Sequence, residues 1–323
     1  MSFALALGIA LLLIPAARWT GLALGLVDRP ADPALAIHAE PVPVLGGPAV
    51  VAAALGSVAL LGRPLPGTVI AAVLVALAAG LTDDMRQLPP IVRLGLLIAA
   101  GVVLASDGLR LETFGPLAGV AVVALVAACT NATNLLDGQN GLAGGLVVIA
   151  SLGLAWIADG GTGERAIGLA LAGALAAFLV FNVPGKIFLG NGGAYGVGTL
   201  LAVVASGPAS SDGWRGVIAA AACLGVFVFE LCLTVARRLA ARSSIASGDR
   251  LHSYDILADR TGSRLRSTIM MWGGGVLAAG VGVTASRVPL AAGIGLSAAG
   301  AAAATAWGIR TWKRRSTSME NER

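Results

Sequence analysis

Long apolar runs alternate with short polar turns along almost the whole chain. Each run has about 16–22 residues, the length that crosses a bilayer as an α-helix, and the turns are rich in glycine, proline and charged residues. The runs lie near 3–19, 46–62, 67–82, 91–106, 116–134, 141–158, 165–182, 193–207, 215–236, 267–285 and 288–309. The pattern predicts an all-α protein, a polytopic transmembrane helical bundle of about 10–11 spans. The lower number applies if the glycine-rich run 193–207 enters and leaves on the same face.

Composition supports a membrane protein over a soluble one. Hydrophobic residues make up 57% of the 323 residues and charged residues only 12%, against about 25% charged residues in average soluble domains. The net charge of +5 comes from loops and the tail, so it does not indicate nucleic-acid binding. We expect one integral membrane domain, residues 1–309, followed by a basic cytoplasmic tail, residues 310–323.

The distribution of lysine and arginine predicts the orientation. No basic residue precedes the apolar segment Phe3–Ile14, whereas Arg18 and Arg29 follow it, which is the order expected when the N-terminus lies outside. With that start, most basic residues fall in inner loops. We therefore predict that the basic loops, including residues 237–266, lie on the cytoplasmic side.

Four polar clusters interrupt the apolar pattern, and all of them fall at the ends of predicted spans. They are Asp83-Asp84 and the segments 131–141, 185–193 and 249–255. An even number of crossings separates the clusters, so each returns to the same face. Together with the loop 28–47, they can form one site on the cytoplasmic side. Ionisable residues in or beside membrane spans usually mark function.

The first two clusters favour a metal ion and hydrogen-bonded ligands. Adjacent carboxylates repel each other, and hard oxygen ligands suit Mg²⁺. The alternative is that Asp83 and Asp84 are solvated acids at a helix end. In the segment 131–141, Asn134, Asp137 and Asn140 can bind the polar edges of sugars and bases. The alternative there is an ordinary Asn/Gly turn.

The other two clusters favour phosphate. Lys186 precedes Asn191-Gly-Gly, where glycine lets backbone N–H groups approach a phosphate at the start of a helix. Arg250 and His252 can hold a diphosphate. A purely structural role remains the alternative for each of the two histidines, His38 and His252.

An ordered series of these residues resembles a known enzyme family. The series is Gly25-Leu-Val-Asp28, His38, Pro41-Val-Pro43, Gly46-Gly47, Asp83-Asp84, Leu88-Pro89, Asn134, Asp137-Gly138, Asn140-Gly141-Leu142, Phe181-Asn182, Pro184-Gly-Lys186-Ile-Phe188-Leu-Gly190, Glu230, Arg237-Arg238 and His252. From about residue 20 to about residue 260, the chain resembles the polyprenyl-phosphate N-acetylhexosamine-1-phosphate transferases. That family starts the lipid-linked intermediates of peptidoglycan, O-antigen and teichoic acid.

The resemblance implies a polytopic helical enzyme with its active site on the cytoplasmic face of a bacterial plasma (inner) membrane. It would transfer an N-acetylhexosamine 1-phosphate, or a related sugar 1-phosphate, from a UDP-sugar to undecaprenyl phosphate and release UMP. The implied cofactor is Mg²⁺, with Mn²⁺ as the alternative, and a homodimer stays open. By position, the implied catalytic residues are Asp83, Asp84 and His252, the implied metal ligands are Asp83, Asp84 and Asn191, and the implied substrate-binding residues are Asn134, Asp137, Asn140, Lys186, Arg250 and His38.

The chain departs from the family pattern at three positions. Asn191 stands where the family usually has the aspartate of a Gly-Asp-x-Gly motif, so we expect weaker metal binding. Asn140 stands where many members have aspartate, and the last loop has one histidine, His252, where many carry several. The single histidine makes the chain more similar to the surface-polysaccharide branch of the family, which catalyses the first membrane step of a surface glycan. Two other interpretations stay open: a catalytically inactive member that binds a lipid-linked sugar, and a membrane transporter.

Overall fold

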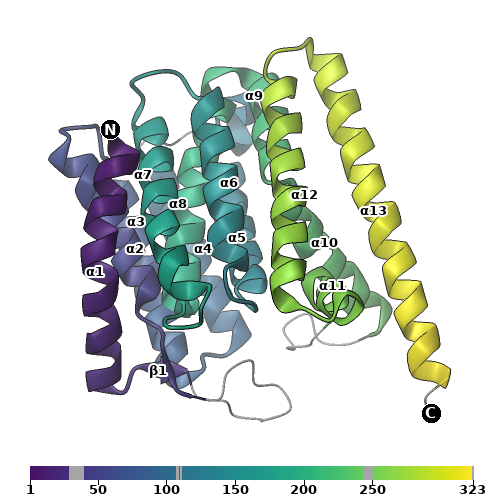
Figure 1. The fold of residues 1–323 in the computed structure, drawn as a ribbon. Coiled ribbons are helices and arrows are strands. Elements are labelled where there is room, and N and C mark those ends of the chain that lie inside the picture. The colour runs from purple at the N-terminus through teal and green to yellow at the C-terminus, as the bar shows by residue number, and fades with distance from the viewer. Residues whose placement is uncertain (29–39, 107–108, 110, 243–250, 322–323) are drawn as a thin grey trace.

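The computed structural model is a bundle of helices that run roughly along one common direction (Figure 1). It describes residues 1–28, 40–106, 109, 111–242 and 251–321, with the backbone alone for 311–321. The helices are α1 (Ser2–Leu24), α2 (Gly46–Leu60), α3 (Gly67–Arg86), α4 (Pro90–Ser106), the 3₁₀ helix η1 (Glu112–Leu117), α5 (Ala118–Leu136), α6 (Leu142–Ile157), α7 (Gly163–Asn182), α8 (Gly190–Ser211), α9 (Gly213–Cys223), α10 (Gly225–Ala240), α11 (Ser253–Thr261), α12 (Arg264–Ala285) and α13 (Leu290–Asn321). The predicted polytopic helical class is confirmed.

Every predicted apolar run coincides with a helix, except that 215–236 is divided between α9 and α10. Within the described part of the chain, six helices are long and apolar enough to cross a membrane: α1, α3, η1–α5, α7, α12 and α13. The pair α9 and α10 would make a seventh span, although the two helices meet at 71°. α2, α4 and α6 are apolar but shorter. The number of about 10–11 crossings therefore stays a prediction.

A short two-stranded ribbon was missed by the all-α prediction. Strand β1 (Val27–Asp28) pairs antiparallel with β2 (Val42–Pro43), and Asp28 lies opposite Val42. Two residues per strand are too few for an alternating pattern to stand out in the sequence. The ribbon lies at one end of the bundle, directly after α1 (Figure 1).

Helix α8 is the central element of the bundle. It packs against α3, α5, α2, α9, α7 and α6, and nearly all of its residues are buried. Small residues allow this crowding, since a Cβ added at Gly47 would lie 1.9 Å from Cα of Gly193. By contrast, α13 stands at the edge of the bundle, and only 6% of its most apolar stretch is buried (Figure 1).

Helix α3 illustrates how the sequence positions the site. Its buried residues recur at intervals of three and four, from Val69 to Asp83, so one face packs into the bundle. The helix ends at Arg86, because Gln87 adopts a left-handed conformation (φ 48°) and Pro89 and Pro90 follow. The carboxylates at its end are therefore held at a defined depth.

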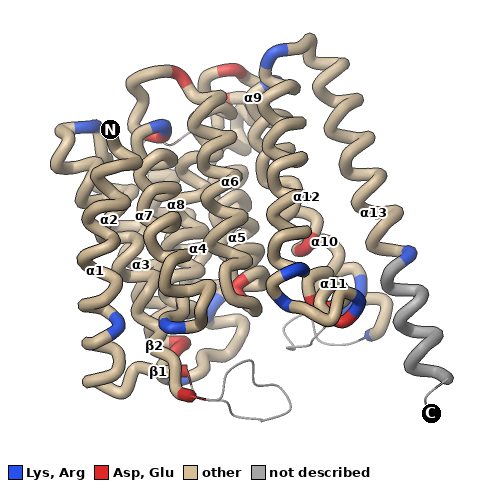
Figure 2. Tube along the Cα trace, in the orientation of Figure 1, with Lys and Arg blue, Asp and Glu red and all other residues tan. Residues whose placement is uncertain are grey.

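Charged residues gather at the two ends of the bundle, and the end that carries the β-ribbon holds most of the basic ones (Figure 2). Met1 lies at the opposite end (Figure 1). The predicted meeting of the polar clusters at one end is confirmed for 83–84, 131–141 and 185–193, and for the described part of 249–255.

Candidate functional site

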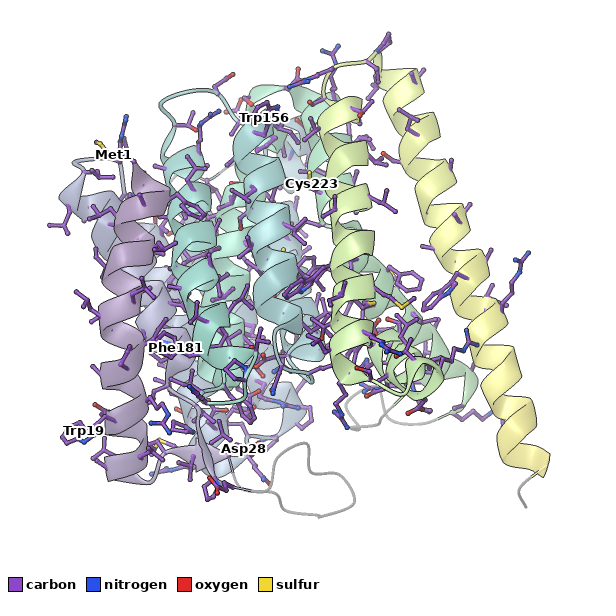
Figure 3. The ribbon with its side chains drawn as sticks, in the orientation of Figure 1. Met1, Trp19, Asp28, Trp156, Phe181 and Cys223 are labelled. Atoms are coloured by element: carbon purple, nitrogen blue, oxygen red, sulfur yellow. The ribbon has the colours of Figure 1, made fainter. Side chains whose placement is uncertain are left out.

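A cavity of ≈ 770 Å³ opens at the end of the bundle that carries the β-ribbon. This volume falls within the usual range of small-molecule pockets, about 300–1,000 Å³. Six residues singled out from the sequence line it: Asp84, Asn134, Asp137, Asn140, Asn191 and His252. Figure 3 labels Asp28, another lining residue, at this end, whereas Met1 and Trp156 lie toward the other.

Asp84 caps the N-terminus of α8. Its Oδ1 accepts a hydrogen bond from the backbone N–H of Asn191 at 2.9 Å, and its Oδ2 accepts one from Gly192 at 3.1 Å. A carboxylate is favourable there because the first N–H groups of a helix lack backbone partners and the N-terminal end of the helix dipole is positive. Asn134 extends the network by donating from Nδ2 to Oδ1 of Asn191 at 2.7 Å. Three sequence clusters are thus joined by hydrogen bonds.

Asp83 has a different environment from its neighbour. It is buried, its Oδ1 accepts from the backbone N–H of Leu88 at 2.7 Å, and its Oδ2 forms an ion pair with Arg93 of α4 at 3.2 Å. Successive residues of an α-helix point about 100° apart, so two adjacent carboxylates cannot share a direction. Asp83 does not line the cavity and instead braces the α3–α4 turn, so its predicted catalytic and metal-binding roles stay a prediction.

Asp137 follows the last residue of α5 and faces the same cavity. Burial raises the pKa of Asp137 well above its ordinary value, and the negative charges of Asp84 and Asp28 add to that shift. Carboxylates from α3, from the end of α5 and from β1 therefore repel each other across the cavity. A bound cation would relieve this repulsion.

The loop between α5 and α6 is tied to its neighbours by hydrogen bonds. The backbone N–H of Gly141 donates to Oδ1 of Asn182 at 2.7 Å. Gln139 is buried and donates to Oγ1 of Thr268 at 2.5 Å and to the carbonyl of Arg264 at 2.8 Å. These bonds hold Asn140, another lining residue of this loop, between α7 and α12.

His252 enters the cavity from the N-terminus of α11. Its Nδ1 lies 2.8 Å from Oε1 of Glu230 on α10, and its ring stacks on Tyr254 at 5.3 Å between centroids. Glu230 is fully buried, and it also accepts from the backbone N–H and the hydroxyl of Ser253. Sequence analysis gave Glu230 no role. Two signals were available for it: its place in the family series, and its being a single acid within the apolar run of α10.

The predicted phosphate-binding residues are only partly present in the cavity lining. Lys186 is exposed outside the lining, and its carbonyl accepts from Nε of Arg18 at 3.1 Å. Arg250 and His38 lie outside the described residues. Two other cations, Arg238 and Arg264, do line the cavity. Arg238 belongs to the family series but was given no role, and Arg264 was missed, because the segment 237–266 contains many arginines that no sequence pattern separates.

The donors in the cavity fit a hard divalent cation that binds largely through substrate phosphates. Among the described residues there is no group of three or more His, Cys, Asp or Glu side chains that could hold a metal by itself. Asp84, Asp137 and Asn191 nevertheless supply oxygen donors around one cavity. Mg²⁺ is usually bound by one or two carboxylates and by phosphates. Asp83, predicted as a ligand, does not belong to this set.

Comparison with known proteins gives consistent results. Residues 67–207 match the model of glycosyl transferase family 4. The chain is 31% identical over 284 residues to the decaprenyl-phosphate N-acetylglucosaminephosphotransferase of Mycobacterium leprae, covering 73% of this chain and 71% of that protein. It is 27% identical over 274 residues to the probable undecaprenyl-phosphate N-acetylglucosaminyl 1-phosphate transferase of Bacillus subtilis, covering 79% and 75%.

A third relative shares a shorter and more similar region. The phospho-N-acetylmuramoyl-pentapeptide-transferase of Lactobacillus delbrueckii is 41% identical over 125 residues, which cover 34% of this chain and 39% of that protein. The family match contains Asp84, Asn134, Asp137 and Asn191, which line the cavity. The chain therefore belongs to the polyprenyl-phosphate N-acetylhexosamine-1-phosphate transferases of glycosyl transferase family 4.

Proposed function

We propose that this protein transfers N-acetylhexosamine 1-phosphate, or a related sugar 1-phosphate, from a UDP-sugar to undecaprenyl phosphate and releases UMP. The reaction would be the first membrane step of a surface glycan. The observation that carries the proposal is the cavity, in which carboxylates, amides, a histidine and two arginines meet at one end of a membrane bundle. A polar pocket at this boundary suits a soluble nucleotide donor and a lipid acceptor.

The reaction exchanges one phosphoanhydride for another. An oxygen of the lipid phosphate attacks the β-phosphorus of the UDP-sugar and forms a new P–O–P bond. The bond between the β-phosphorus and the bridging oxygen breaks, and UMP leaves with the electron pair. Both reactants are anions, so most of the catalytic effect must come from positioning and charge neutralisation.

The residues of the cavity divide these tasks between them. Asp84, Asp137 and Asn191 would hold Mg²⁺, with Mn²⁺ as the alternative. The ion supplies positive charge to the phosphate oxygens when it is bound. Asn134 fixes the amide of Asn191 through their hydrogen bond.

The remaining lining residues suit the donor. Arg238, Arg264 and His252 face the cavity and would bind its phosphates. Asn140 and the rest of the α5–α6 loop offer amides to the nucleotide or the sugar. Arg250 and His38 remain predicted substrate contacts outside the described residues.

The cavity would lie on the cytoplasmic side of a bacterial inner membrane, with the N-terminus outside. Two observations support this orientation. Most basic residues lie at the cavity end (Figure 2), and positive charge favours the cytoplasmic side. Met1 lies at the opposite end of the bundle (Figure 1).

Labelling in intact cells tests the orientation. Single cysteines at two exposed positions, Arg260→Cys at the cavity end and Arg63→Cys at the other, are compared in a chain whose native cysteines are replaced. An impermeant maleimide added from outside should label position 63 and leave position 260 unlabelled until the cells are opened. The reverse pattern would overturn the orientation.

A release assay tests the activity. Purified protein in lipid, undecaprenyl phosphate, Mg²⁺ and a panel of UDP-N-acetylhexosamines should yield UMP and a lipid-linked sugar diphosphate. Glu164→Gln at the opposite end serves as a control that retains turnover. Donor binding without UMP release would identify an inactive family member, and movement of a lipid-linked sugar across vesicles without release would identify a transporter.

A further inference from the structure

The α10–α11 region contains a polar cluster that extends from the cavity lining into the protein. Glu230 has no exposed surface and lies on α10, after the break between α9 and α10. Its carboxylate lies 2.8 Å from Nδ1 of His252 and accepts from the backbone N–H and the hydroxyl of Ser253. A buried carboxylate needs such partners, because an unpaired one is strongly unfavourable. Glu230 therefore holds the start of α11 from inside the protein.

The ring of His252 is restrained on several sides. Besides Glu230, Oγ1 of Thr234 lies 3.4 Å from the same Nδ1. The ring stacks on Tyr254 with an interplanar angle of 3°. The Tyr254 hydroxyl donates to the carbonyl of Leu135 on α5 at 3.2 Å, which fixes the stacking partner in turn.

We propose that Glu230 is a positioning residue that fixes the His252 ring, with Nδ1 donating to its carboxylate and Nε2 presented to the cavity. Nδ1 is engaged by Glu230 inside the protein and His252 lines the cavity, so Nε2 is the ring nitrogen left for a ligand in the cavity. The bond made by one ring nitrogen decides the state of the other. Glu230 thus sets which nitrogen His252 offers to a phosphate oxygen.

This inference rests on the proposed function for what His252 binds, but its first test needs no turnover. The chain has two histidines, so their ring ¹⁵N signals in labelled protein are assigned by the loss of one set in His252→Gln. In the wild-type protein, Nδ1 of His252 should carry a proton and show a hydrogen-bonded shift. A bare Nδ1 with the proton on Nε2 would overturn the proposal, whether or not the protein releases UMP.

Donor affinity in a double-mutant cycle provides the second test. Glu230→Gln keeps the shape of the side chain and should weaken UDP-sugar binding about fivefold or more in the wild-type background. In the His252→Gln background, the same change should cost less than about twofold, because Glu230 acts through the missing ring. Equal losses in both backgrounds would show that Glu230 only supports the fold. Glu164→Gln is the matched control, and a wild-type protein that binds no UDP-sugar would refute the proposed function while leaving the ¹⁵N result valid.

Discussion

The two walls of the cavity hold their polar groups by different means. On the first wall, made by α3, α5 and α8, side chains bond to the backbone of α8, and glycines bring the helices close together. On the second wall, made by α10, α11 and α12, the buried carboxylate of Glu230 on α10 contacts the ring of His252 at the start of α11. The first wall depends on helix packing, and the second on a few side-chain contacts.

This difference predicts different responses to mutation. A substitution that shifts a helix of the first wall should move several site residues together, because Asp84, Asn134 and Asn191 share one network. A substitution in the second wall should act on one group and leave the others in place. Turnover, donor affinity and thermal stability, measured in parallel, separate the two patterns.

The largest effect is expected at the carboxylate of the first wall. Asp84→Asn should lower turnover by at least about a hundredfold, because it removes a negative charge from the start of α8 and from the proposed metal site. Its unfolding temperature should fall modestly, since the amide oxygen can still accept one of the two backbone bonds but the NH2 group faces the other N–H. Turnover near the wild-type value would remove Asp84 from the mechanism.

Asp83→Asn is the matched comparison one residue away. It leaves Arg93 without its buried carboxylate, so it should lower the free energy of unfolding by about 1–3 kcal/mol, which a lower unfolding temperature in detergent would report. Its loss of turnover should be smaller than that of Asp84→Asn. An equal loss with unchanged stability would return Asp83 to the set of reacting residues.

The glycine packing of the first wall can be disturbed without touching a polar side chain. A Cβ at Gly80 would lie 2.3 Å from the backbone oxygen of Asn191, so Gly80→Ala must push α3 and α8 apart. We expect turnover to fall by about tenfold or more, since small displacements of positioned groups are costly. Gly95→Ala on α4, where nothing lies within 4 Å, should have little effect in the same UMP assay. Equal turnover of the two variants would contradict the packing argument.

The second wall should respond more locally. Arg264→Ala removes an exposed cation of the cavity lining and should weaken donor binding by about 1–1.5 kcal/mol, with the unfolding temperature unchanged. Arg266→Ala, two residues further along and outside the lining, is the control. Calorimetric titration with a UDP-sugar measures both. If the two variants bind the donor equally well, Arg264 does not contact the phosphates.

The sequence predicted the parts of this molecule that depend on pattern and could not predict those that depend on contact. Apolar runs of bilayer length located the helices, and even crossings brought the polar clusters to one end. Helical geometry alone predicts that Asp83 and Asp84 point in different directions. Which of the two lines the cavity depends on the packing of α4, which the sequence does not give. The pairing of Glu230 with His252 joins residues 22 positions apart, which no periodicity indicates.

The smallest effect is expected at Asn191, where the first wall departs from the family pattern. Its amide oxygen accepts from Asn134 at 2.7 Å, and its N–H donates to Asp84. An aspartate can keep both bonds, because a carboxylate also accepts from an amide, and it adds a negative charge beside the proposed metal. Asn191→Asp should therefore shift an activity titration to Mg²⁺ concentrations lower by about threefold to tenfold, since charged oxygen ligands bind Mg²⁺ more tightly.

Asn131→Asp, on α5 but outside the cavity lining, controls for added charge and should leave the curve in place. Identical curves for the natural chain and Asn191→Asp would show that position 191 is not at the metal. Activity found only in Asn191→Asp would show that the natural chain is an inactive member of its family, because the missing charge would then be what prevents the reaction.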